Sequence, residues 1–119
     1  FNYIDDTITG FKAALEIKNC DGEVINLGSN FEVSIKDTVE LIAKKMSRKV
    51  SIVPDKNRFR PPKSEVHRLF ASNEKAKKFL NWSPSYKGYE GFSRGIERTI
   101  EWFINPKNLK AYKPDIYNI

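Results

Sequence analysis

Apolar residues recur three or four positions apart in four stretches of the chain. This spacing places side chains along one face of an α-helix, so it predicts four amphipathic helices. The four apolar sets are Ile8, Phe11 and Leu15; Ile35, Val39, Ile42, Ala43 and Met46; Ala76, Phe79 and Leu80; and Tyr89, Phe92, Ile96, Ile100 and Phe103.

Polar residues mark where these helices begin and end. Asp5 and Asp6 suit the positive end of the first helix dipole. Ser34 begins the second helix, with Asp37 three residues later as a shorter-armed version of the capping box. The other predicted limits are turn-forming, capping or proline-bearing positions: residues 19–22, Ser72, residues 82–84 and residues 105–106.

Short β-branched runs lie between the predicted helices. Residues 23–27 are bounded by Gly28 and predict a buried strand, and residues 50–53 alternate up to Pro54. Residues 66–71 are a third extended candidate. The class is therefore α/β, with about four helices and two to four short strands. So small a sheet suggests that another part of a longer protein completes the surface.

The length of 119 residues corresponds to one domain or a piece of one. The chain starts with Phe1, inside what the pattern predicts to be an element, so we expect a fragment of a longer enzyme. We place one domain at residues 1–105 and a C-terminal tail at residues 106–119. The tail lacks periodicity and is either flexible or docked through its tyrosines, Tyr112 and Tyr117.

Composition narrows the class of protein. A hydrophobic fraction of 39% with 13% aromatic residues fits a packed core and excludes a disordered chain. No run approaches the ~18 apolar residues of a membrane span. The single cysteine, Cys20, excludes a disulfide framework and a thiolate metal cage. We expect a cytoplasmic protein with Cys20 as a reduced thiol.

The net charge is +6, and much of it is dispersed on helix faces, as at Lys44, Lys45, Lys77 and Lys78. Cations are concentrated in residues 56–65, which we call the basic loop. Guanidinium groups grip phosphate oxygens bidentately. Pro61 and Pro62 stiffen the loop, which lowers the entropy lost when it orders around a ligand. Ser64 and Glu65 offer a hydroxyl and a carboxylate for sugar or ribose hydroxyls. The cations here are Lys56, Arg58, Arg60 and Lys63, followed by Arg68.

From spacing alone, three interpretations of the basic loop stay open: a solvated run of charges, a site for a small phosphorylated ligand, and a nucleic-acid site. Catalytic chemistry is harder to place. His67 is the only histidine, and no serine or cysteine has a motif around it. Asp5 and Asp6 are explained by the helix start, and Gly28 by a tight turn. We expect no catalytic residue, no cofactor site and no metal site in this chain.

Several strings together resemble the C-terminal part of the NAD-dependent epimerase/dehydratase family, the extended short-chain dehydrogenases/reductases. The resemblance covers nearly the whole chain. The basic loop and the ending at residues 112–118 look most like the UDP-N-acetylglucosamine 4,6-dehydratases of nonulosonate (legionaminic-acid type) pathways. The strings stand in the family's order: residues 1–7, 23–29, 60–66, 71–76, 80–84 and 91–102.

The resemblance implies roles for several residues. Arg60 matches the arginine that binds the diphosphate of a nucleotide sugar, and Arg58 or Lys63 could share that role. Glu65 stands where the family places an acidic residue near the ribose hydroxyls, with Ser64 beside it. Asp6 matches a recurring acidic position at the start of the first helix, with a structural rather than a catalytic role.

The resemblance also implies what belongs elsewhere in the parent enzyme. The glycine-rich NAD loop and the catalytic Tyr and Lys lie upstream of Phe1 in the family, in a Rossmann cofactor domain. We therefore expect this chain to bind a UDP-sugar or another nucleotide sugar, to lack bound NAD and to be inactive alone. The resemblance also allows a homodimeric parent that contacts no membrane. Two alternatives are a nucleic-acid-binding module, prompted by the charge and by Phe59, Tyr86 and Tyr89, and a structural domain without a ligand.

Overall fold

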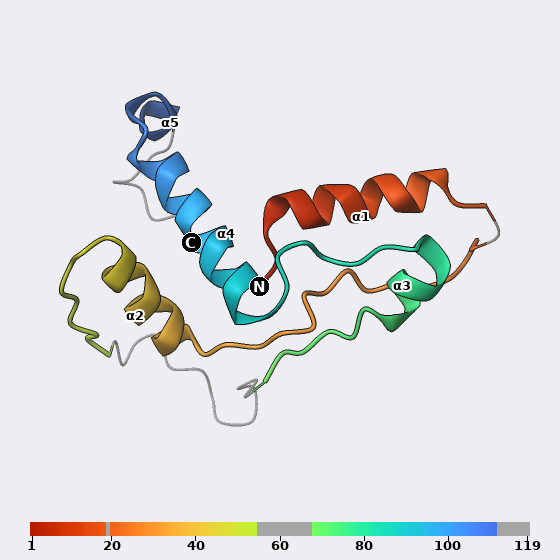
Figure 1. Cartoon of the computed structure of the whole chain (residues 1–119), viewed down its shortest axis with the longest axis horizontal. Coiled ribbons are helices and arrows are strands. Elements are labelled where there is room, and N and C mark those ends of the chain that lie inside the picture. The colour runs from red at the N-terminus through yellow and green to blue at the C-terminus, as the bar shows by residue number, and fades with distance from the viewer. Residues whose placement is uncertain (19, 55–67, 112–119) are drawn as a thin grey trace.

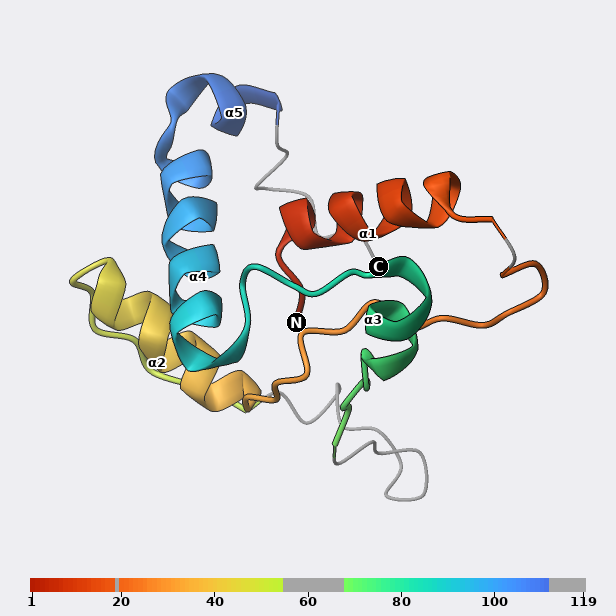
Figure 2. The ribbon, with the colours of Figure 1, turned by 45° about the vertical axis from the view of Figure 1, so that its right-hand side comes forward.

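The computed structural model describes residues 1–18, 20–54 and 68–111 (Figure 1). Within them α1 contacts α3, α2 contacts α4, and α4 contacts α5. Figure 2 shows α2 crossing the lower part of α4, while α1 and α3 lie together on the other side. The five helices are α1 (Ile4–Glu16), α2 (Ile35–Lys45), α3 (Glu74–Leu80), α4 (Gly88–Ile104) and α5 (Pro106–Ala111).

The expected small sheet is wrong for the part of the chain that the structure describes, which is helical and contains no strand. Residues 23–27 and 50–53 are present as irregular segments between helices. A strand is defined by ladder hydrogen bonds to a neighbour, and neither segment has such a neighbour among the described residues. Instead, side chains satisfy part of the backbone: Asn2 Nδ2 donates to the Leu27 carbonyl at 2.6 Å. Of the third candidate, residues 66 and 67 lie outside the described residues.

The predicted helices are confirmed, and a capping side chain explains the start of α2. Ser34 caps α2: its Oγ accepts the N–H of Asp37 at 3.0 Å and donates to Asp37 Oδ2 at 2.7 Å. The short aspartate arm thus bonds the hydroxyl of the cap instead of its backbone N–H. In α3 the cap shifts by one position to Asn73, while Ser72 Oγ accepts the N–H of Glu74 at 3.3 Å.

The chain beyond α4 differs in part from the expected tail. Asn105 ends α4, as predicted, but Pro106–Ala111 then form the short helix α5. Proline is well suited to the first turn of a helix, because its missing N–H would have no intrahelical partner there. The Asn105 side chain supports this start, since its Oδ1 accepts the N–H of Lys107 at 3.0 Å. Tyr112 and Tyr117 lie outside the described residues.

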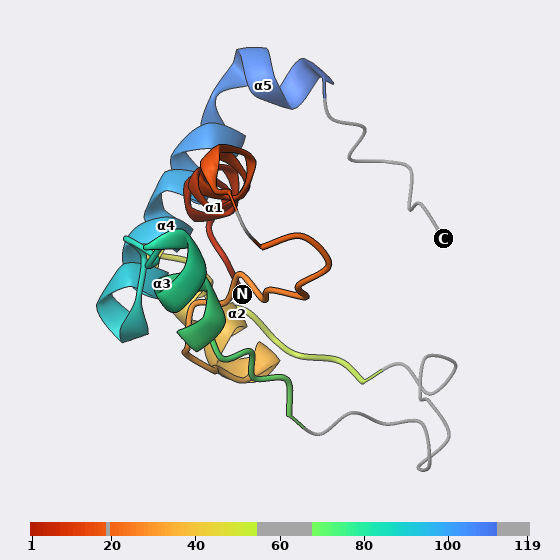
Figure 3. The same ribbon diagram turned by 90° about the vertical axis from the view of Figure 1, so that its right-hand side faces the viewer.

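A small core joins α1, α3 and the segment between α1 and α2. Its buried members are Ala76, Leu80 and Trp82, which are 0%, 7% and 5% exposed. Figure 3 shows α1 end-on above α3, with the chain that follows α1 beside both helices. Partly buried apolar residues complete the cluster: Ala13, Cys20, Ile25, Leu27 and Phe79.

The backbone makes no turn at Gly28, so the tight-turn interpretation of this glycine is wrong. Gly28 instead permits a close approach of two segments. A Cβ on Gly28 would lie 2.5 Å from the carbonyl oxygen of Ala71 and 2.8 Å from the Ala71 Cβ. No side chain fits in that space. Asn73 fastens the same contact, because its Nδ2 donates to the Gly28 carbonyl at 3.1 Å. The segment before α2 is thereby held against the segment before α3.

Candidate functional site

The predicted binding residues all fall on residues 55–67, which lie outside the described part of the chain. Their roles stay predictions. They are Arg58, Arg60, Lys63, Ser64 and Glu65, and the lone His67 lies in the same stretch.

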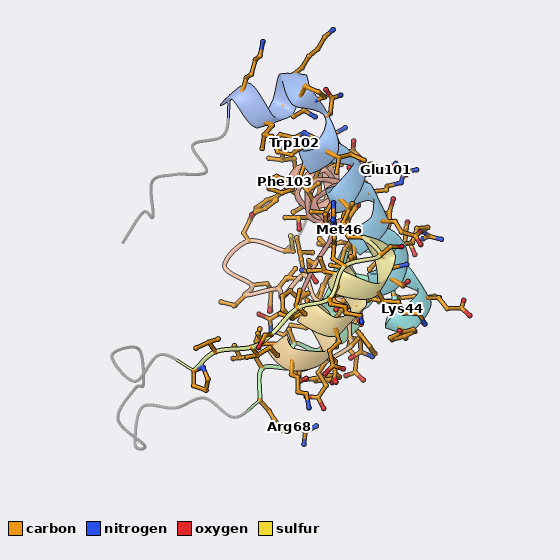
Figure 4. The ribbon with its side chains drawn as sticks, turned by 90° about the vertical axis from the view of Figure 1, so that its left-hand side faces the viewer. Lys44, Met46, Arg68, Glu101, Trp102 and Phe103 are labelled. Atoms are coloured by element: carbon orange, nitrogen blue, oxygen red, sulfur yellow. The ribbon has the colours of Figure 1, made fainter. Side chains whose placement is uncertain are left out.

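Arg68, the first described residue after that stretch, is engaged by a carboxylate. Its Nε donates to Glu32 Oε2 at 3.1 Å, and its Nη2 donates to Glu32 Oε1. The hydrogen bond from Arg68 is the main cause that lowers the pKa of Glu32, and the same bond raises the pKa of Arg68. Both groups are exposed. In Figure 4 Arg68 lies at the opposite end of the molecule from Trp102 and Phe103.

A cavity of about 230 Å³ lies among the described residues, and we call it the aromatic pocket. Three parts of the chain build it: the start of the chain, the segment before α2, and α4 with the loop that precedes it. Apolar walls with a few polar groups are typical of small-molecule sites. The lining residues are Phe1, Asn2, Tyr3, Ser29, Phe31, Tyr86, Gly91, Phe92, Gly95, Ile96 and Thr99.

The rings around this pocket pack in pairs. The centroids of Tyr3 and Tyr86 are 4.3 Å apart. Phe92 is buried, and its ring centroid lies 5.6 Å from that of Phe1 and 6.0 Å from that of Phe31. Aromatic pairs at such distances stabilise one another beyond their buried area. The pocket therefore offers ring faces and edges against which the flat or apolar part of a ligand can pack.

Two glycines on one side of α4 create the room for this arrangement. A Cβ on Gly91 would lie 2.2 Å from the carbonyl carbon of Tyr86, and a Cβ on Gly95 would lie 3.3 Å from Tyr3 Cδ2. Glycines four positions apart share a helix face. This pair in the last predicted helix was the sequence signal for a close contact, and the sequence interpretation missed it.

The polar atoms of the aromatic pocket orient its walls. Asn2 bonds the Leu27 carbonyl, and Ser29 Oγ donates to the carbonyl of Phe31 at 3.4 Å. Thr99 Oγ1 donates to the carbonyl of Gly95 at 2.8 Å, within α4. Tyr86 is also covered by the guanidinium of Arg94, 4.6 Å from the ring centroid. Such a site can bind and orient a ligand, but it contains no paired nucleophile and base.

Asp6 shows a second role that the sequence concealed. It is 3% exposed, and its carboxylate accepts the backbone N–H groups of Ser85 and Tyr86. We predicted a structural acidic residue at the helix start, and the structure adds partners that lie 79 and 80 positions away in the sequence. In the described ranges no three His, Cys, Asp or Glu side chains come together as metal ligands.

Most of the chain matches one protein-family model. Residues 1–95, more than half of the chain, match the family model described as GDP-mannose 4,6 dehydratase. The chain belongs to the GDP-mannose 4,6 dehydratase family. That match spans α1, the aromatic pocket up to Gly95 and the basic loop.

Curated relatives of the chain carry epimerase and dehydratase names. A UDP-glucuronate 4-epimerase of Thermodesulfobacterium geofontis is 32% identical over 114 residues, which cover 95% of this chain and 32% of the relative. A dTDP-D-glucose 4,6-dehydratase of Homo sapiens is 34% identical over 132 residues, covering 96% and 33%. A putative UDP-glucose 4-epimerase of Methanocaldococcus jannaschii is 28% identical over 105 residues, covering 88% and 30%.

The chain therefore spans about a third of the length of these relatives. They support the broad epimerase/dehydratase family that the strings of residues resemble, without singling out one sugar. No solved structure matches the chain significantly. Among the described residues, no helix is long and apolar enough to cross a membrane.

Proposed function

We propose that this chain is the part of a nucleotide-sugar 4,6-dehydratase or epimerase that binds the nucleotide-diphosphate-sugar substrate. The observation that carries the proposal is the family match over residues 1–95, together with the basic loop inside it. The relatives are named for UDP- and dTDP-linked sugars, and the family model is named for GDP-mannose. These compounds share one chemical feature, a diphosphate that joins a sugar to a nucleoside. A positively charged loop suits that diphosphate.

Each group of the loop has a separate task in this proposal. Arg60 binds the diphosphate with its planar fork of N–H donors, and Arg58 or Lys63 adds charge. Ser64 and Glu65 bond hydroxyls of the ribose or the sugar. The aromatic pocket supplies the apolar wall, with Tyr86 and Phe31 packing against a ring of the ligand. Binding of this kind fixes the sugar in the orientation that the reaction needs.

The cofactor belongs to the rest of the parent enzyme in this proposal. NAD, when bound there, supplies oxidation at C4 of the sugar, and this chain contributes position only. The six glycines of the chain form no glycine-rich dinucleotide loop. We accordingly propose that the 119-residue chain binds substrate without turning it over. Among possible sugars the likeness of the basic loop favours UDP-N-acetylglucosamine and a dehydratase of the nonulosonate type.

Isothermal titration calorimetry with UDP-N-acetylglucosamine tests the proposal. Arg60→Gln should weaken binding about 10- to 100-fold, because a charge-assisted hydrogen bond contributes ~1.5–3 kcal/mol. Lys44→Gln is the matched control, since Lys44 is an exposed cation on α2 and should leave the affinity unchanged. Equal effects of the two substitutions would contradict the role of Arg60.

The same titration separates the rival functions. A single-stranded oligonucleotide that binds more tightly than the nucleotide sugar, with an affinity that falls steeply with salt, would indicate a nucleic-acid module. No heat with either ligand would indicate a structural domain. Dehydratase or epimerase turnover by the purified chain would contradict the assignment of catalysis to the rest of the parent.

A further inference from the structure

Asp6 is the only buried charged side chain among the described residues. Its Oδ1 accepts the N–H of Ser85 at 2.7 Å, and its Oδ2 accepts the N–H of Tyr86 at 2.9 Å. Hydrogen bonds from a backbone N–H to an ionised carboxylate are about twice as strong as neutral ones. Because the two donors belong to successive peptide groups, one carboxylate fixes both the position and the direction of the backbone there.

The opposite side of the same two residues is held by α4. Arg94 Nη2 donates to the carbonyl of Ser85 at 2.7 Å, and the guanidinium lies over the Tyr86 ring. Gly91 allows the Tyr86 backbone to approach the helix. Residues 85 and 86 are therefore clamped between α1, which binds their N–H groups, and α4, which binds a carbonyl.

The clamp acts on the aromatic pocket through Tyr86. The Tyr86 ring packs on Tyr3 and lines the pocket, so its place depends on where its own backbone is held. We propose that Asp6 is a positioning residue that keeps Tyr86 in place as a wall of the aromatic pocket before a nucleotide sugar binds. This inference rests on the proposed function. A wall that is ordered in advance lowers the entropy lost on binding.

A role for Asp6 limited to the start of α1 does not account for these contacts. Asp5 lies in the same first turn, is exposed and satisfies the helix dipole equally well. Both Asp6 oxygens instead face a loop that follows α3. A second contact, from Trp82 Nε1 to Thr9 Oγ1 at 3.1 Å, already joins α1 to the beginning of that loop. Asp6 adds hydrogen bonds to Ser85 and Tyr86, and Tyr86 lines the aromatic pocket.

The test compares three substitutions in the full 119-residue chain. Asp6→Asn keeps the shape but loses the charge, and it places an amide N–H₂ opposite one of the two backbone donors. Asp5→Asn removes a neighbouring charge without touching the loop. Thr9→Val removes the hydrogen bonds of Thr9 Oγ1 to Trp82 Nε1 and to the Asp6 backbone carbonyl, which lowers stability. It leaves in place the Asp6 carboxylate that bonds Ser85 and Tyr86. Titration with UDP-N-acetylglucosamine gives the affinity, and urea unfolding gives the stability of each variant.

Asp6→Asn should weaken binding about tenfold, which corresponds to about a tenth of the molecules keeping the pocket formed. It should also remove nuclear Overhauser effects between the Tyr3 and Tyr86 rings and speed amide exchange at residues 85 and 86. Asp5→Asn and Thr9→Val should keep the affinity and these ring contacts. Unchanged affinity in Asp6→Asn, or an equal loss of affinity in Thr9→Val, would overturn the inference.

Failure of the proposed function gives a different pattern. If the wild-type chain binds no nucleotide sugar, that function is contradicted, and the ring contacts and amide exchange still decide the role of Asp6. Asp6→Asn must then lose the Tyr3–Tyr86 contacts while the amides of Ala76 and Leu80 stay protected. Retention of those ring contacts in Asp6→Asn would overturn the positioning role by itself.

Discussion

The two sides of α1 differ in chemistry and in use. The side that packs on the rest of the described residues is polar or small: Asp6 is 3% exposed, Gly10 is buried, and Thr9 bonds Trp82. The opposite side carries the large apolar residues. Ile8, Phe11 and Leu15 are 45%, 62% and 86% exposed. At ~100° per residue the apolar positions fall within about 60° of one another, nearly opposite Asp6 and Gly10.

Hydrophobic periodicity is usually taken to show both that a segment is helical and which face of the helix is buried. In α1 it shows only the first. The period shows that residues 4–16 form a helix, as observed. It does not show which face packs on the neighbouring elements. The inner side of α1 packs through two other means, a close approach at Gly10 and hydrogen bonds at Asp6 and Thr9. The substitutions below test that contrast, from the largest expected effect to the smallest.

Trp82→Ala should have the largest effect. Trp82 is 5% exposed in the core beside α1, and truncation of a buried large aromatic side chain costs ~3–5 kcal/mol of unfolding free energy. Urea unfolding followed by circular dichroism measures the loss. Trp102→Ala is the control, because Trp102 is 47% exposed, and it should cost less than about 1 kcal/mol. Similar losses of unfolding free energy in the two variants would contradict the assignment of Trp82 to the core.

Asp6→Ala should rank second, with a loss of about 2–3 kcal/mol, because the N–H groups of Ser85 and Tyr86 lose their acceptors. Asp5→Ala removes an exposed carboxylate from the same turn and should change the unfolding free energy by less than ~1 kcal/mol, the range of a helix-dipole effect. Differential scanning calorimetry of the pair gives both values. A larger loss of unfolding free energy in Asp5→Ala than in Asp6→Ala would contradict the claim that the side of α1 with Asp6 holds the helix in place.

Thr9→Val should rank third. Valine keeps the volume of threonine but offers no acceptor to Trp82 Nε1 and no donor to the Asp6 carbonyl, so we expect a loss of about 1–2 kcal/mol. Hydrogen exchange of the Trp82 indole proton should become faster. Thr7→Val, on the same helix, serves as control and should leave that proton protected. An indole proton whose protection stays unchanged in Thr9→Val would contradict this hydrogen bond.

Leu15→Lys should have the smallest effect, within about 0.5 kcal/mol, because the Leu15 side chain is already 86% exposed. Thermal unfolding of the isolated chain measures it, and sedimentation equilibrium of both proteins shows whether they stay monomeric. A loss above 2 kcal/mol would mean that something covers the outer side of α1 in solution, and the contrast between the two sides would fail.

Local patterns predicted much of the fold and little of the site. Helical spacing and the Ser34 cap identified α2, and the stop at Asn105 identified the end of α4, because these features depend on residues a few positions apart. The run at residues 23–27 has a strand-like composition, but strand pairing needs a partner that no local pattern supplies. The Asp6 contact joins positions 79 and 80 apart, which periodicity cannot reveal.

The same limit applies to the binding residues. Charge and proline content pointed to the basic loop, and the family match includes it, yet its contacts stay a prediction. The aromatic pocket, by contrast, became visible only in three dimensions, since Phe1, Phe31 and Tyr86 come from distant parts of the chain. A Gly91–Gly95 pair on one helix face was the one local sign of it.

The most direct test of the central claim is a ¹H–¹⁵N nuclear magnetic resonance titration of the chain with UDP-N-acetylglucosamine. We predict saturable shifts at residues 58–66 and at aromatic-pocket residues such as Phe31 and Tyr86, while the exposed end of α1 near Leu15 stays unchanged. No shifts with the nucleotide sugar at millimolar concentration, or shifts only with an oligonucleotide, would contradict the assignment of this chain as a nucleotide-sugar-binding part.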